Sequence, residues 1–215
     1  MTSAISPSTK ALGFWSALLA TTFSIAYDFG QISEWLGSQG GPESSSTPLG
    51  LVVLLTPSLF LGSSFLVLVV CIHELASPDR RIWSRTAIAF ITAYAVLISL
   101  NYSVLLTYVA PRLATGRVAG IEPFLFTPFD SFLYSMDILG YSFMSLATLL
   151  AARVFTGESL ERRARLFLNA NGLLLPFLAL QIYVHWLIWI AALWAVTFPE
   201  HQLDTTFKLR RDATK

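Results

Sequence analysis

Charged residues are scarce in this sequence of 215 residues. Only 13% of its residues are charged, whereas 54% are hydrophobic and the mean hydropathy is +0.63. Soluble domains carry about 25% charged residues, so the composition excludes a soluble globular enzyme. The 14 basic and 13 acidic residues leave a net charge of +1, which excludes the basic footprint of a nucleic-acid-binding protein. The sequence therefore predicts an integral membrane protein whose first partner is the lipid bilayer.

Cysteine and metal-binding motifs are scarce as well. The single cysteine, Cys71, excludes an internal disulfide and any cysteine-rich metal site. His73 and Glu74 begin a possible zinc motif, but the residue four positions after His73 is Ser77 rather than a second histidine. Because no nucleotide-binding motif occurs either, we expect no metal and no cofactor.

What the sequence does have is long apolar runs. A helix needs about 20 apolar residues to cross the hydrocarbon core of a bilayer. Five runs meet that length, at residues 11–36, 49–75, 87–110, 131–152 and 168–198. We therefore predict an all-α bundle of five transmembrane helices with short loops, forming a single membrane domain over residues 1–215.

The first run has a second interpretation as a cleaved signal peptide. Lys10 precedes it, and Ser24 and Ala26 fit a small-x-small cleavage site. The apolar run nevertheless continues to Leu36, beyond the length of a usual signal core, and this favours a retained span.

The basic residues of the short loops predict the orientation in the membrane. Residues 77–85 and 153–165 contain seven arginines between them, whereas residues 37–48 contain no basic residue. This pattern places the N-terminus and both basic loops in the cytoplasm. Five spans would then place the basic residues of 208–215 outside, which conflicts with the rule. A hairpin within 168–198 would remove the conflict, but 31 residues are too few for two full spans.

Three segments carry a resemblance to known sequences. They are LLTPSLFLG (54–62), PFDSFLYSMDILGYSFMSLATLLAA (128–152) and NGLLLPFLALQIYVHWLIWIAALWAVTFP (171–199). With them the chain resembles a group of bacterial multi-pass membrane proteins of unknown function. The resemblance implies a location in the bacterial cell (cytoplasmic) membrane, and it implies no activity, substrate or cofactor.

Polar residues inside the apolar runs are the candidates for a functional site. An ionisable side chain at the centre of an inserted helix costs roughly 2.5 to 3.5 kcal/mol, so such residues are candidate functional groups. Asp137 and Tyr141 are four residues apart, as are Gln181 and His185, and each pair shares a helix face. The full candidate set is Asp28, Tyr94, Asn101, Asp137, Tyr141, Gln181 and His185.

Asp28, Asn101, Asp137 and His185 fall at a similar depth when the residues of each run are counted at the helical rise of 1.5 Å. We therefore expect one polar cavity in the outer half of the bilayer that binds or transports a small ligand or a proton. A membrane-embedded enzyme with Asp137 and His185 as an acid–base pair is an alternative. A third interpretation is an accessory subunit, in which the polar residues only join helices by hydrogen bonds.

Overall fold

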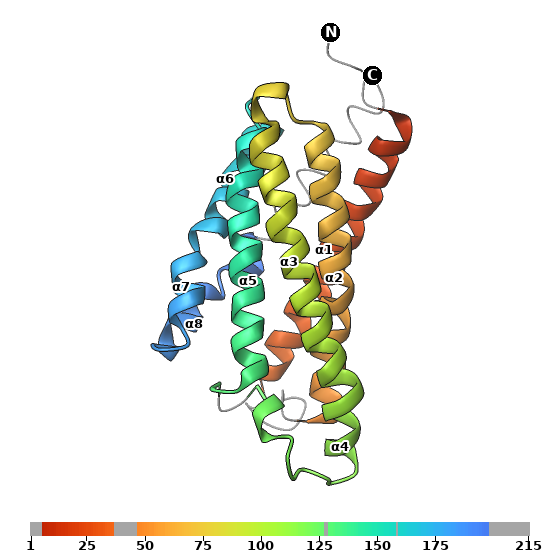
Figure 1. Cartoon of the computed structure of the whole chain (residues 1–215), viewed down its shortest axis with the longest axis vertical. Helices are drawn as coiled ribbons and strands as arrows, with labels where there is room; N and C mark the ends of the chain where they lie inside the picture. Colours follow the sequence, from red (N-terminus) through yellow and green to blue (C-terminus); the bar gives the residue numbers. More distant parts are fainter. Residues whose placement is uncertain (1–5, 37–46, 127–128, 158, 198–215) are drawn as a thin grey trace.

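The computed structural model describes residues 6–36, 47–126, 129–157 and 159–197, and this part of the chain is helical, with no strand. Four long helices form the bundle in Figure 1: α1 (Pro7–Trp35), α2 (Pro48–Glu74), α3 (Arg81–Val104) and α5 (Phe132–Ala151). Each packs against the next in chain order, and consecutive helices run in opposite directions. The predicted all-α class is confirmed.

Capping residues explain where three of these helices begin. The side chains of Ser6, Thr47 and Ser131 each accept a hydrogen bond from a backbone N–H in the first turn of α1, α2 and α5. Proline follows directly at Pro7 and Pro48, where the first helical position requires no N–H donor. The sequence thus sets these helix starts locally.

Short segments extend α3 at both ends. A 3-10 turn (Pro78–Arg80) precedes it, and a π-helical turn (Leu105–Val109) leads from it into α4 (Ala110–Ala114). In the π turn the Ala110 N–H bonds to the Leu105 carbonyl, five residues back. Such a turn adds a residue to the helix and rotates the side chains beyond it about the helix axis.

The π turn changes the direction of one tyrosine. Tyr94, Asn101 and Tyr108 repeat every seven residues, a spacing that keeps residues close to one helix face. Tyr94 and Asn101 are fully buried, but Tyr108 lies in the π turn and is 39% exposed. Its ring contacts the Arg112 guanidinium instead, 3.4 Å from the ring centroid.

Three helical stretches of the described residues are long and apolar enough to cross a membrane. They are Pro48–Glu74, Pro78–Ala114 and Phe132–Val154. Helix α1 is of similar length but less apolar than α2. Length and composition therefore support a membrane protein, while the count of five spans is not confirmed.

The prediction of one continuous helix over 168–198 is wrong. The chain instead forms α6 (Leu160–Leu173), α7 (Leu175–Leu180), a turn at 181–184, a 3-10 turn (His185–Leu187) and α8 (Ile188–Ala191). Beyond the turn the chain runs back, with α8 packed against α7 (Figure 1), and the Thr197 hydroxyl lies 3.4 Å from the Asn171 amide oxygen. We call residues 171–197 the hairpin. Residue 198 lies outside the described part of the chain.

Two local causes interrupt this helix. Pro176 has no N–H for the Gly172 carbonyl, and α7 begins anew with Pro176 in its first turn. Further along, Val184 leaves the helical region at φ −130° and ψ 80°. Ile182, Tyr183 and Val184 are residue types with reduced helix propensity, so the turn forms without glycine or proline.

The outer surface of the bundle is apolar. Phe29 is 70% exposed, Val96 52% and Leu100 56%. Monomeric soluble proteins rarely expose such an extensive apolar surface, so its presence fits contact with lipid.

The two basic connectors lie together at one end of the bundle. The Arg80 guanidinium donates a hydrogen bond of 2.6 Å to the carbonyl of Arg153. Arg81 and Arg85 begin α3 at this end, and α6 begins there as well (Figure 1). We call this the basic end; α1 ends and α5 begins at the opposite end.

Candidate functional site

One face of α5 supplies most of the polar residues of the bundle interior. Tyr134, Asp137, Tyr141 and Thr148 follow one another at three-, four- and seven-residue steps, and each is at most 7% exposed. These steps place side chains above one another on a single helix face. The face looks inward, toward α1, α2, α3 and the hairpin.

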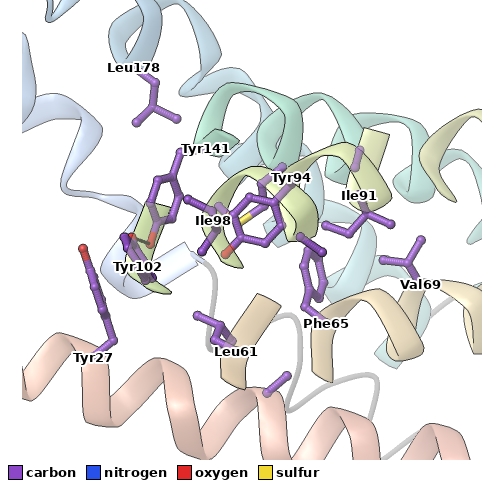
Figure 2. Packing of buried hydrophobic residues seen from close by; sticks show 14 of the residues in the cluster. Tyr27, Leu61, Phe65, Val69, Ile91, Tyr94, Ile98, Tyr102, Tyr141 and Leu178 are labelled. Atoms are coloured by element: carbon purple, nitrogen blue, oxygen red, sulfur yellow. Dashed lines mark hydrogen bonds between the residues drawn. The ribbon is translucent and has the colours of Figure 1, made fainter. Parts of the chain in front are cut away.

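The Tyr141 hydroxyl is the centre of a hydrogen-bonded group. It lies 3.1 Å from the Ser58 hydroxyl on α2 and 3.1 Å from the Tyr102 hydroxyl on α3. Figure 2 shows Tyr27, on α1, with its hydroxyl turned toward Tyr102 and Tyr141. Three helices therefore meet at one tyrosine of α5.

Asp137 contacts two neighbouring residues of α3. The Asn101 Nδ2 donates to Asp137 Oδ1 at 3.4 Å and to the Leu133 carbonyl at 3.0 Å. Asn101 is fully buried and Asp137 is 7% exposed. Tyr102, the next residue on α3, also interacts with the Asp137 carboxyl through its hydroxyl.

A cavity of about 140 Å³ lies beside this group. Its walls are the C-terminal half of α1, the N-terminal half of α5 and the hairpin, with Leu54 of α2 and the segment before α5 completing it. The polar and aromatic lining residues are Tyr27, Asp28, Gln31, Glu34, Phe126, Phe129, Tyr134, Asp137, Tyr141, Gln181 and Trp194. The cavity is thus nearer the end opposite the basic end, and it has the volume for a small ligand or several waters.

Three polar atoms in the lining have no hydrogen-bond partner within the described part of the chain. They are Asp28 Oδ1, the Tyr134 hydroxyl and Gln181 Oε1. Gln181 is 3% exposed and Tyr134 is 5% exposed. Leaving such a buried group unsatisfied costs about 1 to 3 kcal/mol, so unpartnered atoms in a cavity indicate a place where a bound molecule or water completes the bonding.

No family model, curated protein or solved structure matches this chain.

The structure brings six of the seven predicted site residues together. Asp28, Asp137, Tyr141 and Gln181 line the cavity. Asn101 bonds to Asp137, and the Tyr94 ring lies 5.6 Å from that of Tyr141.

His185 is the predicted residue that lies elsewhere. Its side chain is exposed, and its ring stacks on Phe129 with centroids 4.5 Å apart. The turn at 181–184 separates it from Gln181, although a continuous helix would have put both on one face. His185 is therefore not a lining residue, and it makes no hydrogen bond to Asp137 in the described structure.

Several lining residues were not predicted. The Trp194 ring packs 5.1 Å from Tyr27 and 5.9 Å from Tyr141. Glu34 is 7% exposed and accepts a bond of 2.9 Å from the Gln31 amide. Tyr134 shares the α5 face of Asp137, as its three-residue spacing indicates in the sequence, although it was not in the candidate set. Trp194 reaches the cavity only because the chain turns back.

The described residues contain no group of three or more His, Cys, Asp or Glu side chains arranged to hold a metal ion. The carboxyls of Asp28, Glu34 and Asp137 are instead distributed around the cavity wall. This arrangement suits a molecule of several atoms better than a single metal ion.

Proposed function

We propose that this chain is a multi-pass protein of the bacterial cell membrane that binds a small ligand in the cavity, as a binding or transport protein does. The observation that carries the proposal is the set of unpartnered polar atoms of Asp28, Tyr134 and Gln181 in one cavity. Polar atoms that only join helices would have their partners on those helices, as the Asn101 amide nitrogen and Asp137 Oδ1 do.

In this proposal α1, α2, α3 and α5 cross the bilayer, and the hairpin enters it without crossing. Non-helical backbone at membrane depth is tolerated where it lines a cavity or is buried in protein, and the hairpin supplies cavity residues. The arginines of the basic end favour the cytoplasmic side for that end. The cavity then belongs to the outer half of the bilayer.

The enzyme alternative has less support. It requires Asp137 and His185 as an acid–base pair, and a general base has to be within hydrogen-bond reach of the proton it moves. His185 stacks on Phe129 and does not line the cavity that Asp137 lines. The accessory-subunit interpretation predicts a cavity closed to water, so a test of access separates it from our proposal.

The test uses a cysteine at the cavity wall. Ala192 lines the cavity and is half-buried. We would replace it (Ala192→Cys) in a Cys71→Ala background and measure its reaction with the small neutral reagent methyl methanethiosulfonate. Because the thiolate is the reacting form, the reaction requires water at the site. We expect the cysteine at 192 to react.

Val96→Cys in the same background is the matched control. Val96 is 52% exposed on the outer face of α3, in the middle of a predicted span. A thiol surrounded by lipid does not ionise, so we expect no reaction there. Lack of reaction at both positions would overturn the proposal and favour an accessory subunit.

A further inference from the structure

The charge of the cavity has one sign. Asp28, Glu34 and Asp137 line it, and among the described residues its lining includes no Lys, Arg or His. The carboxyls share one neighbourhood, because Tyr27 interacts electrostatically with all three. Asp28 Oδ1 has no hydrogen-bond partner within the described part of the chain. A buried carboxylate oxygen left in this way is costly, and a bound cation would lower that cost.

The unpartnered atoms have a matching chemistry. Asp28 Oδ1 and Gln181 Oε1 only accept hydrogen bonds, and the Tyr134 hydroxyl can accept as well as donate. Gln181 is 3% exposed and lines the cavity, so its oxygen has little access to bulk water. A ligand that completes these bonds has to be a donor, as a protonated amine is.

The remaining wall is aromatic and aliphatic. Trp194 packs against Tyr27 and Tyr141 at 5.1 and 5.9 Å between ring centroids. Ring faces attract a cation, most strongly when it is shielded from water. Leu54, Ile138, Leu178 and Ile188 supply apolar contacts, which suit a short alkyl chain.

A bare metal ion fits this wall less well. Metal ligands have to converge on a point, at about 2.0 to 2.6 Å from the ion for hard cations such as magnesium and calcium. No such group of three occurs among the described residues. Carboxyls distributed around an aromatic wall correspond better to an organic cation.

Resting on the proposed function, we propose that the ligand class of the cavity is small primary ammonium compounds. The ammonium group donates to the Asp28 and Gln181 oxygens, and the alkyl portion packs between the aromatic rings and the aliphatic residues.

The experiment measures protection of the cysteine at 192 in the Cys71→Ala, Ala192→Cys protein. The rate of modification by methyl methanethiosulfonate is followed with added n-butylammonium, with 1-butanol and with butyrate. These three probes have similar size and differ in charge and in hydrogen-bond donors. We expect n-butylammonium to slow the modification and the other two to leave it unchanged.

Asp28→Asn removes one carboxylate charge with little change of shape. We expect it to raise the n-butylammonium concentration that gives half-protection by about tenfold, since hydrogen bonds to charged groups contribute at least that much. Glu34→Gln removes a second carboxylate charge from the cavity lining. It replaces Asp28→Asn in the experiment if that protein does not fold. Glu122→Gln, at an exposed carboxyl outside the cavity lining, is the control and should have no effect.

The outcomes separate this inference from the proposed function. If the cysteine at 192 reacts but 1-butanol or butyrate protects as well as n-butylammonium, or n-butylammonium does not protect, the ligand class is wrong and the accessible cavity stands. The ligand class is also wrong if n-butylammonium protects the Asp28→Asn and Glu34→Gln proteins as well as it protects the protein without these substitutions. If the cysteine at 192 does not react at all, both proposals fail.

Discussion

Single residues of this protein owe their roles to the neighbours that they contact on other helices. Asp137 and Asn101 were predicted as candidates because they are polar residues in apolar runs, and each is bonded to the other in the fold. The sequence carries no information of that kind about Trp194, since tryptophans are common near membrane surfaces. Residue type alone therefore identifies the polar residues of the cavity better than it identifies the aromatic ones.

Tyr141→Phe tests the hydrogen-bonded group at the residue scale. The change removes the hydroxyl that contacts both Ser58 and Tyr102. We expect it to lower the free energy of unfolding by about 1 kcal/mol, in line with hydrogen bonds between membrane helices. The measurement is unfolding of the purified protein in detergent by a denaturing detergent.

Tyr108→Phe is the matched control, because Tyr108 is 39% exposed and contacts Arg112 through its ring face, which phenylalanine retains. Its unfolding free energy should remain close to that of the original protein. An equal loss in both proteins would mean that the Tyr141 hydroxyl does not join the helices.

At the scale of elements, close approach between α5 and α6 depends on Gly172. A Cβ added at this position would lie 2.1 Å from Leu149 Cγ and 2.8 Å from the Ser145 carbonyl oxygen. No side chain fits there unless the helices separate. The hairpin that begins at this point owes its position against α5 to that contact.

Gly172→Ala is accordingly expected to destabilise the protein by roughly 1 to 3 kcal/mol, the usual cost of an overpacked contact. Unfolding in detergent again gives the measurement. Gly62→Ala is the control, since a Cβ there meets its nearest atoms at 3.8 Å. Adding Leu149→Ala should restore only part of the loss, because the Ser145 carbonyl remains. No difference between the two glycine variants would contradict the packing.

Asn171 holds the two arms of the hairpin and connects them to α5. Its amide donates to the Thr148 hydroxyl at 3.1 Å, and its oxygen accepts from Thr197 at 3.4 Å. Asn171→Leu removes both bonds, so we expect the hairpin to open more often and the cysteine at 192 to react several-fold faster. Asn169→Leu, at a half-buried residue bonded only to the carbonyl of Arg165 within α6, should leave the rate unchanged.

The elements differ in how far sequence alone predicts them. The apolar runs that contain α2, α3 and α5, together with the polar connectors between them, were predicted because length and composition act locally. The break at 181–184 was not, because Ile182, Tyr183 and Val184 are not turn-forming residues. Contacts of Trp194 with Tyr27 and Tyr141 stabilise the returning arm, and such long-range contacts override local preference. The wrong prediction of a continuous helix over 168–198 placed His185 on the same face as Gln181.

At the scale of the whole molecule, the basic end and the cavity end should face opposite sides of the membrane. Single cysteines at Ser77 and Thr115 in the Cys71→Ala background report each end, since both residues are exposed and lie at opposite ends of the long helix that contains α3. We expect a membrane-impermeant maleimide to label the cysteine at 115 in intact cells, because the positive-inside rule predicts that the basic end faces the cytoplasm.

The cysteine at 77 should react only after the cells are permeabilised. A third cysteine at Thr156, next to the second basic connector, should behave like that at 77, because Arg80 and Arg153 are in contact. Labelling of both ends from the same side would contradict the orientation and the outer position of the cavity.

The place of the hairpin in the chain has a consequence for biogenesis. A ribosome makes α1, α2, α3 and α5 before it makes residues 171–197, so the wall that carries Asp28 and Asp137 has no cover until the hairpin has been made. During that interval the two carboxyls face the insertion machinery or lipid, both poor substitutes for water. Assembly of this protein is thus most vulnerable after α5 has been made and before the hairpin follows, when the nascent chain lacks one wall of the cavity.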